Sequence, residues 1–350
     1  MSLKRIWVLF VARNYEFVRD RAGFGWNILF PFLIVVGFGV MFNGDSRSEY
    51  KLGVWPVPDK TAAVNTLDIP EKLKRYEYIK VVPFASFDRA VEKLRHHKID
   101  LLLENRADRP GYWVTDTSPK GYILERVVKE SLIPEEAFEG RVKKQTVHGD
   151  EIRYIDWLFP GILGMNIMFS SLFGVGYVIV RYRRSGVLKR LKATPVTAFE
   201  YLTAQMASRV VVLLSTSCLV WVGCDAIFSF QMKGSYWDVF WVFLAGTVCM
   251  ICLGLVLASR GTNEELTNGV INFICWPMMF MSEVWFSVEG ASPWVKSLAQ
   301  ALPLTHFLSA ARQIINDGAT LSQVSWEMGF LVGTSLLFLT VGSFLFSWTK

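Results

Sequence analysis

Six long apolar runs, each with at most one charged residue, constrain the fold of this chain more than any other feature. The first covers residues 24–42 without a charge. A helix rises about 1.5 Å per residue, so these roughly 19 residues can cross a hydrocarbon core about 30 Å thick. The other runs lie at residues 155–180, 206–224, 239–258, 266–286 and 324–348. They predict an α-helical membrane protein with six transmembrane helices.

A polar stretch separates the first run from the second. Residues 44–154 are too many for a connection without structure of its own. Short segments rich in β-branched and aromatic residues predict strands within residues 51–57, 78–84, 100–104 and 112–116, and helices are expected within residues 86–97 and 120–132. Strands that alternate with helices predict a small α/β domain.

Basic residues beside the apolar runs orient the chain. Five Lys and Arg precede the first run, and a denser cluster without an acidic residue follows the second run at residues 181–195. Because Lys and Arg resist translocation, both flanks belong on the cytoplasmic side. Six crossings with both termini in the cytoplasm satisfy this rule. Residues 44–154 then form an extracytoplasmic domain, and residues 155–350 contain spans two to six.

The N-terminal residues 1–23 have the pattern of a helix with two unlike sides. Leu3 and Phe10 fall on one side of it, and Arg5 and Glu16 fall on the other. We therefore expect an amphipathic interfacial helix, ended by Gly23, that contacts membrane lipids on the inner leaflet. The first transmembrane helix follows at residues 24–43.

The short motifs that mark an enzyme are missing from the sequence. It has no G-x-x-x-x-G-K-[ST] phosphate loop, no H-E-x-x-H and no G-x-S-x-G, and none of its four histidines is placed with a nucleophile. The net charge of +6 comes largely from basic residues beside apolar runs, which suits anionic lipid headgroups better than nucleic acid. We expect no catalytic residue, no metal site, no cofactor in this chain and no nucleic-acid partner.

The basic cluster is also a motif. After its arginine-rich start, residues 181–195 contain Gly186, Val187, Leu188, Arg190, Leu191, Thr194 and Pro195 in that order. This pattern resembles the cytoplasmic coupling segment of ABC-2 type transporter permeases. It implies a cytoplasmic coupling loop at residues 181–205.

A second resemblance to the same family covers residues 266–315. The matching positions are Pro277, Ser282, Trp285, Phe286, Pro293, Trp294, Leu302, Pro303, Leu304, Thr305 and Arg312. One residue departs from the family pattern, because Glu283 stands where a Gly is usual. Pro277 lacks the N–H that a helix requires, so we expect a helix break there. The apolar pieces within residues 287–322 are too short to cross, which predicts an outer re-entrant segment.

The resemblance implies a permease homodimer bound to two nucleotide-binding ATPase subunits, which hold ATP and Mg²⁺. ATP binding would close the ATPases and push on the coupling loop, and export is the family's usual direction. We expect a hydrophobic or amphipathic substrate, while a drug, a lipid, a peptide, an ion and an envelope polymer precursor all remain open. The bacterial cytoplasmic (inner) membrane is the implied location. An extracytoplasmic accessory protein is a further candidate partner.

Each residue of the coupling motif has an expected part in this mechanism. Gly186 lets the chain turn sharply after the second span. Leu188 and Leu191 supply apolar contacts to the ATPase, and Arg190 reaches its carboxylates. Thr194-Pro195 begins the helix of the third span, with Thr194 as its cap. The alternative is that these residues only organise a loop at the membrane surface.

Polar groups and methionines at membrane depth are candidates for the substrate pathway, because placing polar groups in lipid is costly. The candidates are Asn27, Asn166, Asn272, Met278 and Glu283. The asparagines suit interhelical hydrogen bonds equally well, and Met278 suits core packing. Glu283 is expected to line the exit path, to pair with Arg312 or to face headgroup water.

Two functions fit these observations. The first is the membrane-spanning permease subunit of an ATP-binding cassette exporter. The second is a membrane receptor or scaffold whose outer domain senses a ligand. A sensor with six spans would normally carry a cytoplasmic signalling domain, whereas the cytoplasmic sequence here is nearly all loops. This difference favours the permease.

Overall fold

The computed structural model divides into two compact units, Met1–Met41 with Glu151–Lys350, and Phe42–Asp150. It describes residues 2–42, 50–57, 67, 69–76, 78–95, 98–105, 111–115, 118–131, 153–259, 261, 263–288 and 291–348. Residue 44, at which the polar domain is expected to begin, and residue 350 lie outside these ranges. We call the first unit the helical unit and the second the sheet unit.

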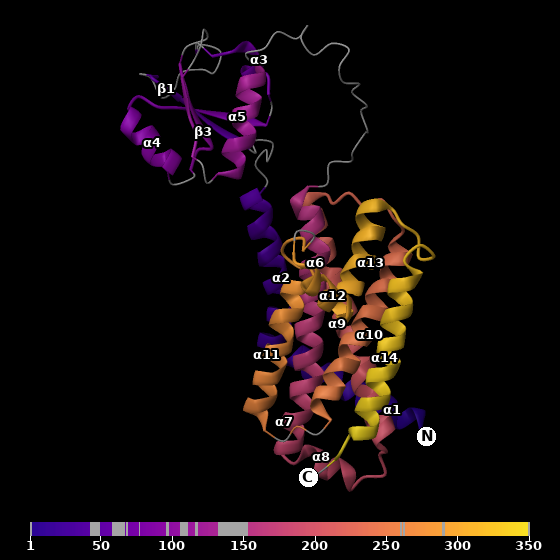
Figure 1. Cartoon of the computed structure of the whole chain (residues 1–350). Coiled ribbons are helices and arrows are strands. Elements are labelled where there is room, and N and C mark those ends of the chain that lie inside the picture. Colours follow the sequence, from indigo (N-terminus) through magenta and orange to yellow (C-terminus); the bar gives the residue numbers. More distant parts are fainter. Residues whose placement is uncertain are drawn as a thin grey trace. The chain divides into compact units, whose positions relative to one another are not determined.

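The helical unit is a bundle of long helices (Figure 1). Its elements are α1 (Leu3–Arg19), α2 (Arg21–Phe42), α6 (Tyr154–Ser171), the π-helix η3 (Leu172–Tyr177), α7 (Val178–Arg184), α8 (Val187–Lys192), α9 (Ala198–Phe228), α10 (Tyr236–Ala258), α11 (Glu264–Met281), α12 (Pro293–Gln300), α13 (Pro303–Asp317) and α14 (Ser325–Leu345). In Figure 1, α1 and the C-terminal end of α14 lie at the same end of the unit as α8.

In the part of the chain that the structure describes, five helices are long and apolar enough to cross a membrane. They are Gly23–Met41, Tyr154–Arg184, Ala198–Phe228, Tyr236–Ala258 and Ser325–Leu345, and they coincide with five of the six apolar runs. The remaining run forms α11, which begins with two glutamates and does not meet the same criterion. The chain is therefore an α-helical membrane protein, and the sixth crossing stays a prediction.

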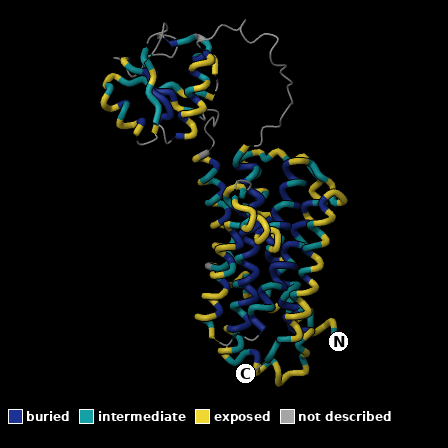
Figure 2. Tube along the Cα trace, in the orientation of Figure 1, coloured by how far each residue is buried: buried dark blue, intermediate teal, exposed yellow. Residues whose placement is uncertain are grey.

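The core of the helical unit forms around α10, which packs against α14, η3, α13, α9 and α6. Figure 2 shows the buried residues along the inward faces of these helices. Only 17% of the most apolar stretch of α2 and 11% of that of α14 is buried. Their apolar side chains instead face outward, as those of lipid-exposed helices do.

The boundary between α1 and α2 differs from the expected one. α1 ends at Arg19 and α2 begins at Arg21, so Gly23 lies inside α2 and does not end the first helix. The break falls at Asp20, whose Oδ1 accepts a 3.0 Å hydrogen bond from the Gly23 N–H. A carboxylate that satisfies a free N–H in the first turn of a helix favours its start at this point.

Within its described residues, the sheet unit contains four strands in the order β2-β1-β3-β4. β1 (Tyr50–Trp55) pairs in parallel with β2 (Ile79–Pro83) and β3 (Leu101–Glu104), and β3 pairs antiparallel with β4 (Tyr112–Trp113). The helices are α3 (Glu71–Lys74), α4 (Phe87–Arg95) and α5 (Pro119–Ser131). Each strand lies within or at the edge of a segment that the sequence assigns to a strand.

Alternation along the strands divides the core of the sheet unit into two layers. Leu101 and Leu103 pack with Leu124 of α5, whereas Leu102 packs with Leu94 of α4. Successive side chains of a strand point to opposite faces, so α5 and α4 cover opposite faces of the sheet.

Candidate functional site

The basic segment after η3 forms a helix, a sharp turn and a second short helix. α7 ends at Arg184, and Gly186 then adopts φ +76° and ψ +6° as the residue before α8. This left-handed conformation is costly for residues that carry a Cβ, and it is present where the sequence predicts a glycine turn. The turn sets α8 apart from α7 at the end of the bundle.

The two faces of α8 differ in a way that corrects one expectation. The Leu188 side chain is 0% exposed in the core of the helical unit, and the partly buried Leu191 packs against the same core. Leu188 is therefore not available to a partner, because the apolar side of α8 turns inward. Lys189, Arg190 and Lys192 are exposed. None of these three cations has an ion pair within the described ranges.

The start of α9 also differs from the expected one. Thr194 does not cap this helix, because its Oγ1 donates a 2.6 Å hydrogen bond back to the Leu191 carbonyl at the end of α8. The cap is Thr197, whose hydroxyl accepts a 3.2 Å hydrogen bond from the Glu200 N–H. The Glu200 carboxylate accepts a 3.0 Å bond from the Thr197 N–H in return. This reciprocal pair is a capping box, so the helix begins at Ala198.

The first residues of the chain form hydrogen bonds with the loop between α8 and α9 and with the start of α9. The Ser2 N–H donates to the Glu200 carboxylate at 2.7 Å, and Arg5 donates to the Pro195 carbonyl. The Arg5 guanidinium also lies 3.9 Å from the Glu200 carboxylate. Pro195, expected to be the first residue of a helix, is instead an acceptor through which α1 contacts the loop between α8 and α9.

A second set of contacts joins α1 to α7. Arg13 donates hydrogen bonds to the Tyr182 hydroxyl at 2.8 Å and to the Glu16 carboxylate at 2.7 Å, and Tyr182 donates to Glu16. Arg181 lies 3.6 Å from Glu16. Burial alone would raise the pKa of the Glu16 carboxyl, but the Tyr182 and Arg13 hydrogen bonds and the nearby guanidinium charges outweigh it and lower the pKa.

The arginines of α7 therefore serve the fold. Arg183 donates to the backbone carbonyls of Ala258, Ser259 and Ser347 at 2.9 to 3.1 Å, and also to that of Gly261. Arg184 lies 3.6 Å from the Glu264 carboxylate. Within the described residues, the cations of the basic cluster that have no ion pair or hydrogen bond are those of α8.

Two of the predicted pathway residues meet at a cavity of about 510 Å³ inside the helical unit. Asn166 of α6 donates a 3.2 Å hydrogen bond to the Asn27 carbonyl of α2, and the Ser170 hydroxyl donates to the Asn27 side chain. Both asparagines thus form interhelical hydrogen bonds and line this cavity, and their part in a substrate pathway stays a prediction.

The other predicted pathway residues lie elsewhere. Asn272 bonds within α11, where its side chain donates to the Asn268 carbonyl at 2.9 Å. Met278 is 2% exposed in the core, while its neighbour Met279 lines the cavity. Arg209 of α9, which the sequence analysis did not select, also lines this cavity. The signal was a single charge within the apolar run 206–224.

The end of α11 is shaped by Glu283. α11 continues through Pro277 to Met281, so the helix break expected at this proline is not present. Glu283 follows with φ +59°. This is the conformation in which glycine is favoured, which gives a physical reason for the glycine that the family pattern has at this position.

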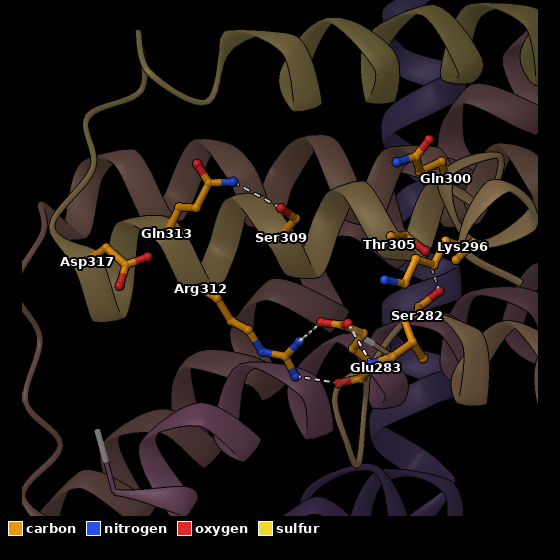
Figure 3. A pocket seen from close by; sticks show the side chains of 11 residues that line it. Ser282, Glu283, Lys296, Gln300, Thr305, Ser309, Arg312, Gln313 and Asp317 are labelled. Atoms are coloured by element: carbon orange, nitrogen blue, oxygen red, sulfur yellow. Dashed lines mark hydrogen bonds and ion pairs between the residues drawn. The ribbon is translucent and has the colours of Figure 1, made fainter. Parts of the chain in front are cut away.

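The predicted pairing of Glu283 with Arg312 is present. The carboxylate lies 3.8 Å from the Arg312 guanidinium, which also donates to the Glu283 carbonyl at 2.6 Å (Figure 3). The guanidinium donates to the Trp157 carbonyl at 3.1 Å as well. Both side chains line a polar cavity of about 500 Å³ between the end of α11, α12 and α13. Glu283 therefore pairs with Arg312 and lines a cavity at once.

Comparison with known proteins assigns these features to a family. A family model described as ABC-2 family transporter protein matches residues 21–344. The daunorubicin resistance ABC transporter permease protein DrrB1 of Streptomyces coeruleorubidus is 21% identical over 188 residues, which cover 52% of this chain and 63% of that protein. The inner membrane transport permease YhhJ of Escherichia coli is 25% identical over 175 residues, or 46% of this chain and 44% of that protein. This chain thus spans less than two thirds of either relative.

Proposed function

The chain belongs to the ABC-2 family of transporter proteins, and from this membership we propose that it is the membrane-spanning permease subunit of an ABC exporter in the bacterial inner membrane. A separate ATP-binding subunit supplies the energy, and ATP and Mg²⁺ bind there. Two copies of the chain form the permease, with both termini in the cytoplasm. The substrate is hydrophobic or amphipathic.

The observation that carries the proposal is the exposed cationic face of α8. Lys189, Arg190 and Lys192 are exposed and unpaired within the described ranges, whereas Arg181, Arg183 and Arg184 of the same cluster have partners in the helical unit. Charge-assisted contacts with carboxylates of a partner would satisfy these free cations. The exposed Phe199, 62% accessible, adds an apolar group beside the same loop.

The structure also suggests how movement at α8 would reach the spans. Leu188 is buried in the bundle core, so a push on the outer face of α8 is carried inward by a packed side chain. α8 is joined through Gly186 to α7 and through the capped turn at Thr197 to α9. The α1 contacts to Pro195 and Tyr182 tie the N-terminal helix to the same movement.

The finer parts of the organisation belong to the same proposal. α1 lies at the membrane interface, α11 is the fifth of six spans, and α12 with α13 forms an outer re-entrant segment. The sheet unit is an extracytoplasmic α/β domain, to which an accessory protein can bind. The cavity beside Asn27 and Asn166 is part of the substrate pathway.

Charge reversal on α8 tests the coupling face. Arg190→Glu should weaken attachment of the ATP-binding subunit about tenfold or more, because a hydrogen bond to a charged group contributes about 1.5 to 3 kcal/mol. Co-purification and vanadate-sensitive ATPase activity of the reconstituted complex measure this. The matched control is Lys296→Glu, the same charge change on the exposed surface of α12. Equal attachment of both variants would argue against the coupling role.

Topology is tested by thiol labelling of intact cells. Single cysteines replace Ser86 of the sheet unit or Ser185 beside α8, both exposed, in a chain without its five native cysteines. An impermeant thiol reagent should label position 86 and leave position 185 unlabelled. The reverse result would place α8 outside the cell, where no cytoplasmic ATPase can reach it.

The receptor or scaffold alternative is less favoured, because the family match covers residues 21–344.

A further inference from the structure

Arg209 places a positive charge deep inside the helical unit. It lies in the N-terminal half of α9, one of the helices that can cross a membrane, and the residue is only 8% exposed. An ionised group at this depth is costly unless another group neutralises it. Such a residue therefore marks a functional site by default.

Arg209 contacts a backbone carbonyl and an aromatic ring, and neither carries a negative charge. Its Nε donates to the Ser170 carbonyl at 3.0 Å, its Nη2 donates to the same oxygen at 2.5 Å, and the guanidinium carbon lies 5.4 Å from the centre of the Phe17 ring. No carboxylate forms an ion pair with it in the ranges that the structure describes. Gly174 makes room for the guanidinium, because a Cβ at this position would lie 2.1 Å from the Arg209 Cζ.

Arg312 is another buried arginine of the helical unit, and its charge partners differ from those of Arg209. Arg312 is 9% exposed and also donates to backbone carbonyls, yet it has the Glu283 carboxylate at 3.8 Å. Arg13 of α1, whose charge acts on Arg209, has the Glu16 carboxylate at 2.7 Å. Arg209 is thus hydrogen-bonded but not neutralised.

The cavity beside Arg209 is largely apolar elsewhere. Its volume of about 510 Å³ is within the usual range for small-molecule sites. Its aromatic lining residues are Trp26, Phe30, Phe169, Phe173, Trp276 and Trp285. Trp26 of α2 is 62% exposed and Trp276 of α11 is 51% exposed, so aromatic side chains extend from the cavity to the outer surface of both helices.

We propose that this cavity binds amphipathic molecules that carry one anionic group, and that Arg209 holds this group. The guanidinium offers N–H donors and an unbalanced charge to a carboxylate or phosphate, while the aromatic walls cover the apolar body. This inference rests on the proposed role of the cavity in the substrate pathway. It adds the chemical class of the substrate, which the family does not specify.

A pair of probes that differ only in charge tests the proposal. The full-length chain is reconstituted in phosphatidylcholine nanodiscs, and energy transfer from its tryptophans to pyrenedecanoate or to the neutral pyrenedecanol is titrated. We expect the carboxylate to bind about tenfold more tightly than the alcohol. Equal affinities of the wild-type chain for the two probes overturn the proposal without any variant.

Variants assign the preference to Arg209. Arg209→Gln should abolish it, Arg209→Lys should keep much of it, and the matched buried arginine variant Arg312→Gln should leave it unchanged. A preference that persists in Arg209→Gln, or that is lost equally in Arg312→Gln, overturns the assignment. Thermal unfolding of each variant confirms that a folded chain is compared.

A last arm identifies the source of the anion. Probe binding is repeated in nanodiscs that contain about one third phosphatidylglycerol. If membrane lipid competes for the site, probe binding to the wild-type chain becomes weaker, whereas binding to Arg209→Gln does not change. If binding to the wild-type chain is also unchanged, the site is assigned to free amphiphiles. Both outcomes support an anion site, whereas equal weakening in both chains contradicts it. The assay needs no ATPase, so its failure leaves the coupling proposal to be judged by the α8 variants.

Discussion

Arg13 of α1 and Tyr182 of α7 are joined by a 2.8 Å hydrogen bond across 169 positions of sequence. The guanidinium carbon of Arg13 also lies 5.6 Å from the centre of the Tyr182 ring. Glu16 accepts from both residues, which makes a compact charged cluster. α1 is therefore attached to α7 by specific polar contacts, in addition to any contact with lipid.

This cluster predicts a pH dependence. Because the pKa of Glu16 is lowered in the folded chain, its stabilising contribution is fully present above the ordinary carboxyl pKa of about 4.3 and is lost as the pH falls through the lowered value. The Glu16 side chain is 44% exposed, so the effect on the free energy of unfolding is only about 0.3 to 1 kcal/mol. The measurement is the unfolding midpoint in detergent between pH 3 and 7. Glu16→Gln should show a shallower loss on acidification; identical curves would exclude this role.

The turn at Gly186 predicts a backbone effect without a packing effect. Nothing lies within 4 Å of a Cβ built at this position, yet φ is +76°. Gly186→Ala should therefore lower the free energy of unfolding by about 1 kcal/mol, and Gly186→Asn by less, because Asn tolerates this conformation better. The control is Gly269→Ala, a site inside α11 with equal space, where a slight gain is expected. A neutral Gly186→Ala would show that the turn relaxes.

The conformation of Glu283 predicts that its glycine variant is more stable than its alanine variant. Glu283→Ala removes the ion pair with Arg312 and keeps a side chain at φ +59°, whereas Glu283→Gly removes the ion pair and also the backbone strain. The glycine variant should therefore be more stable than the alanine variant by about 1 kcal/mol. Thermal unfolding monitored by tryptophan fluorescence distinguishes them. If the alanine variant is the more stable one, the left-handed conformation at this position is not retained.

Alanine substitutions of the two threonines before α9 should lower the free energy of unfolding by different amounts. Thr197→Ala removes the capping box and should cost about 1 kcal/mol of unfolding free energy. Thr194→Ala removes only an exposed hydroxyl bonded to the Leu191 carbonyl, and its effect should stay within about 0.5 kcal/mol. Chemical or thermal unfolding of the two variants side by side is the measurement. A larger loss for Thr194→Ala would restore it as the cap.

Features that depend on local composition follow from the amino-acid sequence alone. Apolar runs of sufficient length specify membrane helices because the bilayer leaves backbone groups no other partner, and five of the runs form such helices. The turn at Gly186 follows from the absence of a Cβ. The spacing of Thr197 and Glu200 is also that of a capping box, so this cap can be predicted from the sequence. The Thr-Pro pattern before it favoured Thr194 instead.

What each side chain contacts depends on how the helices pack together. Leu188 and Arg190 are both within the coupling motif, yet the core covers the first and leaves the second exposed. Glu283 neutralises Arg312 from 29 positions away, while nothing in the described chain neutralises Arg209. Periodicity and composition report the character of a residue but not its distant neighbours. The charge balance of a buried site is set by those neighbours, and it therefore emerged only when the helices were packed together.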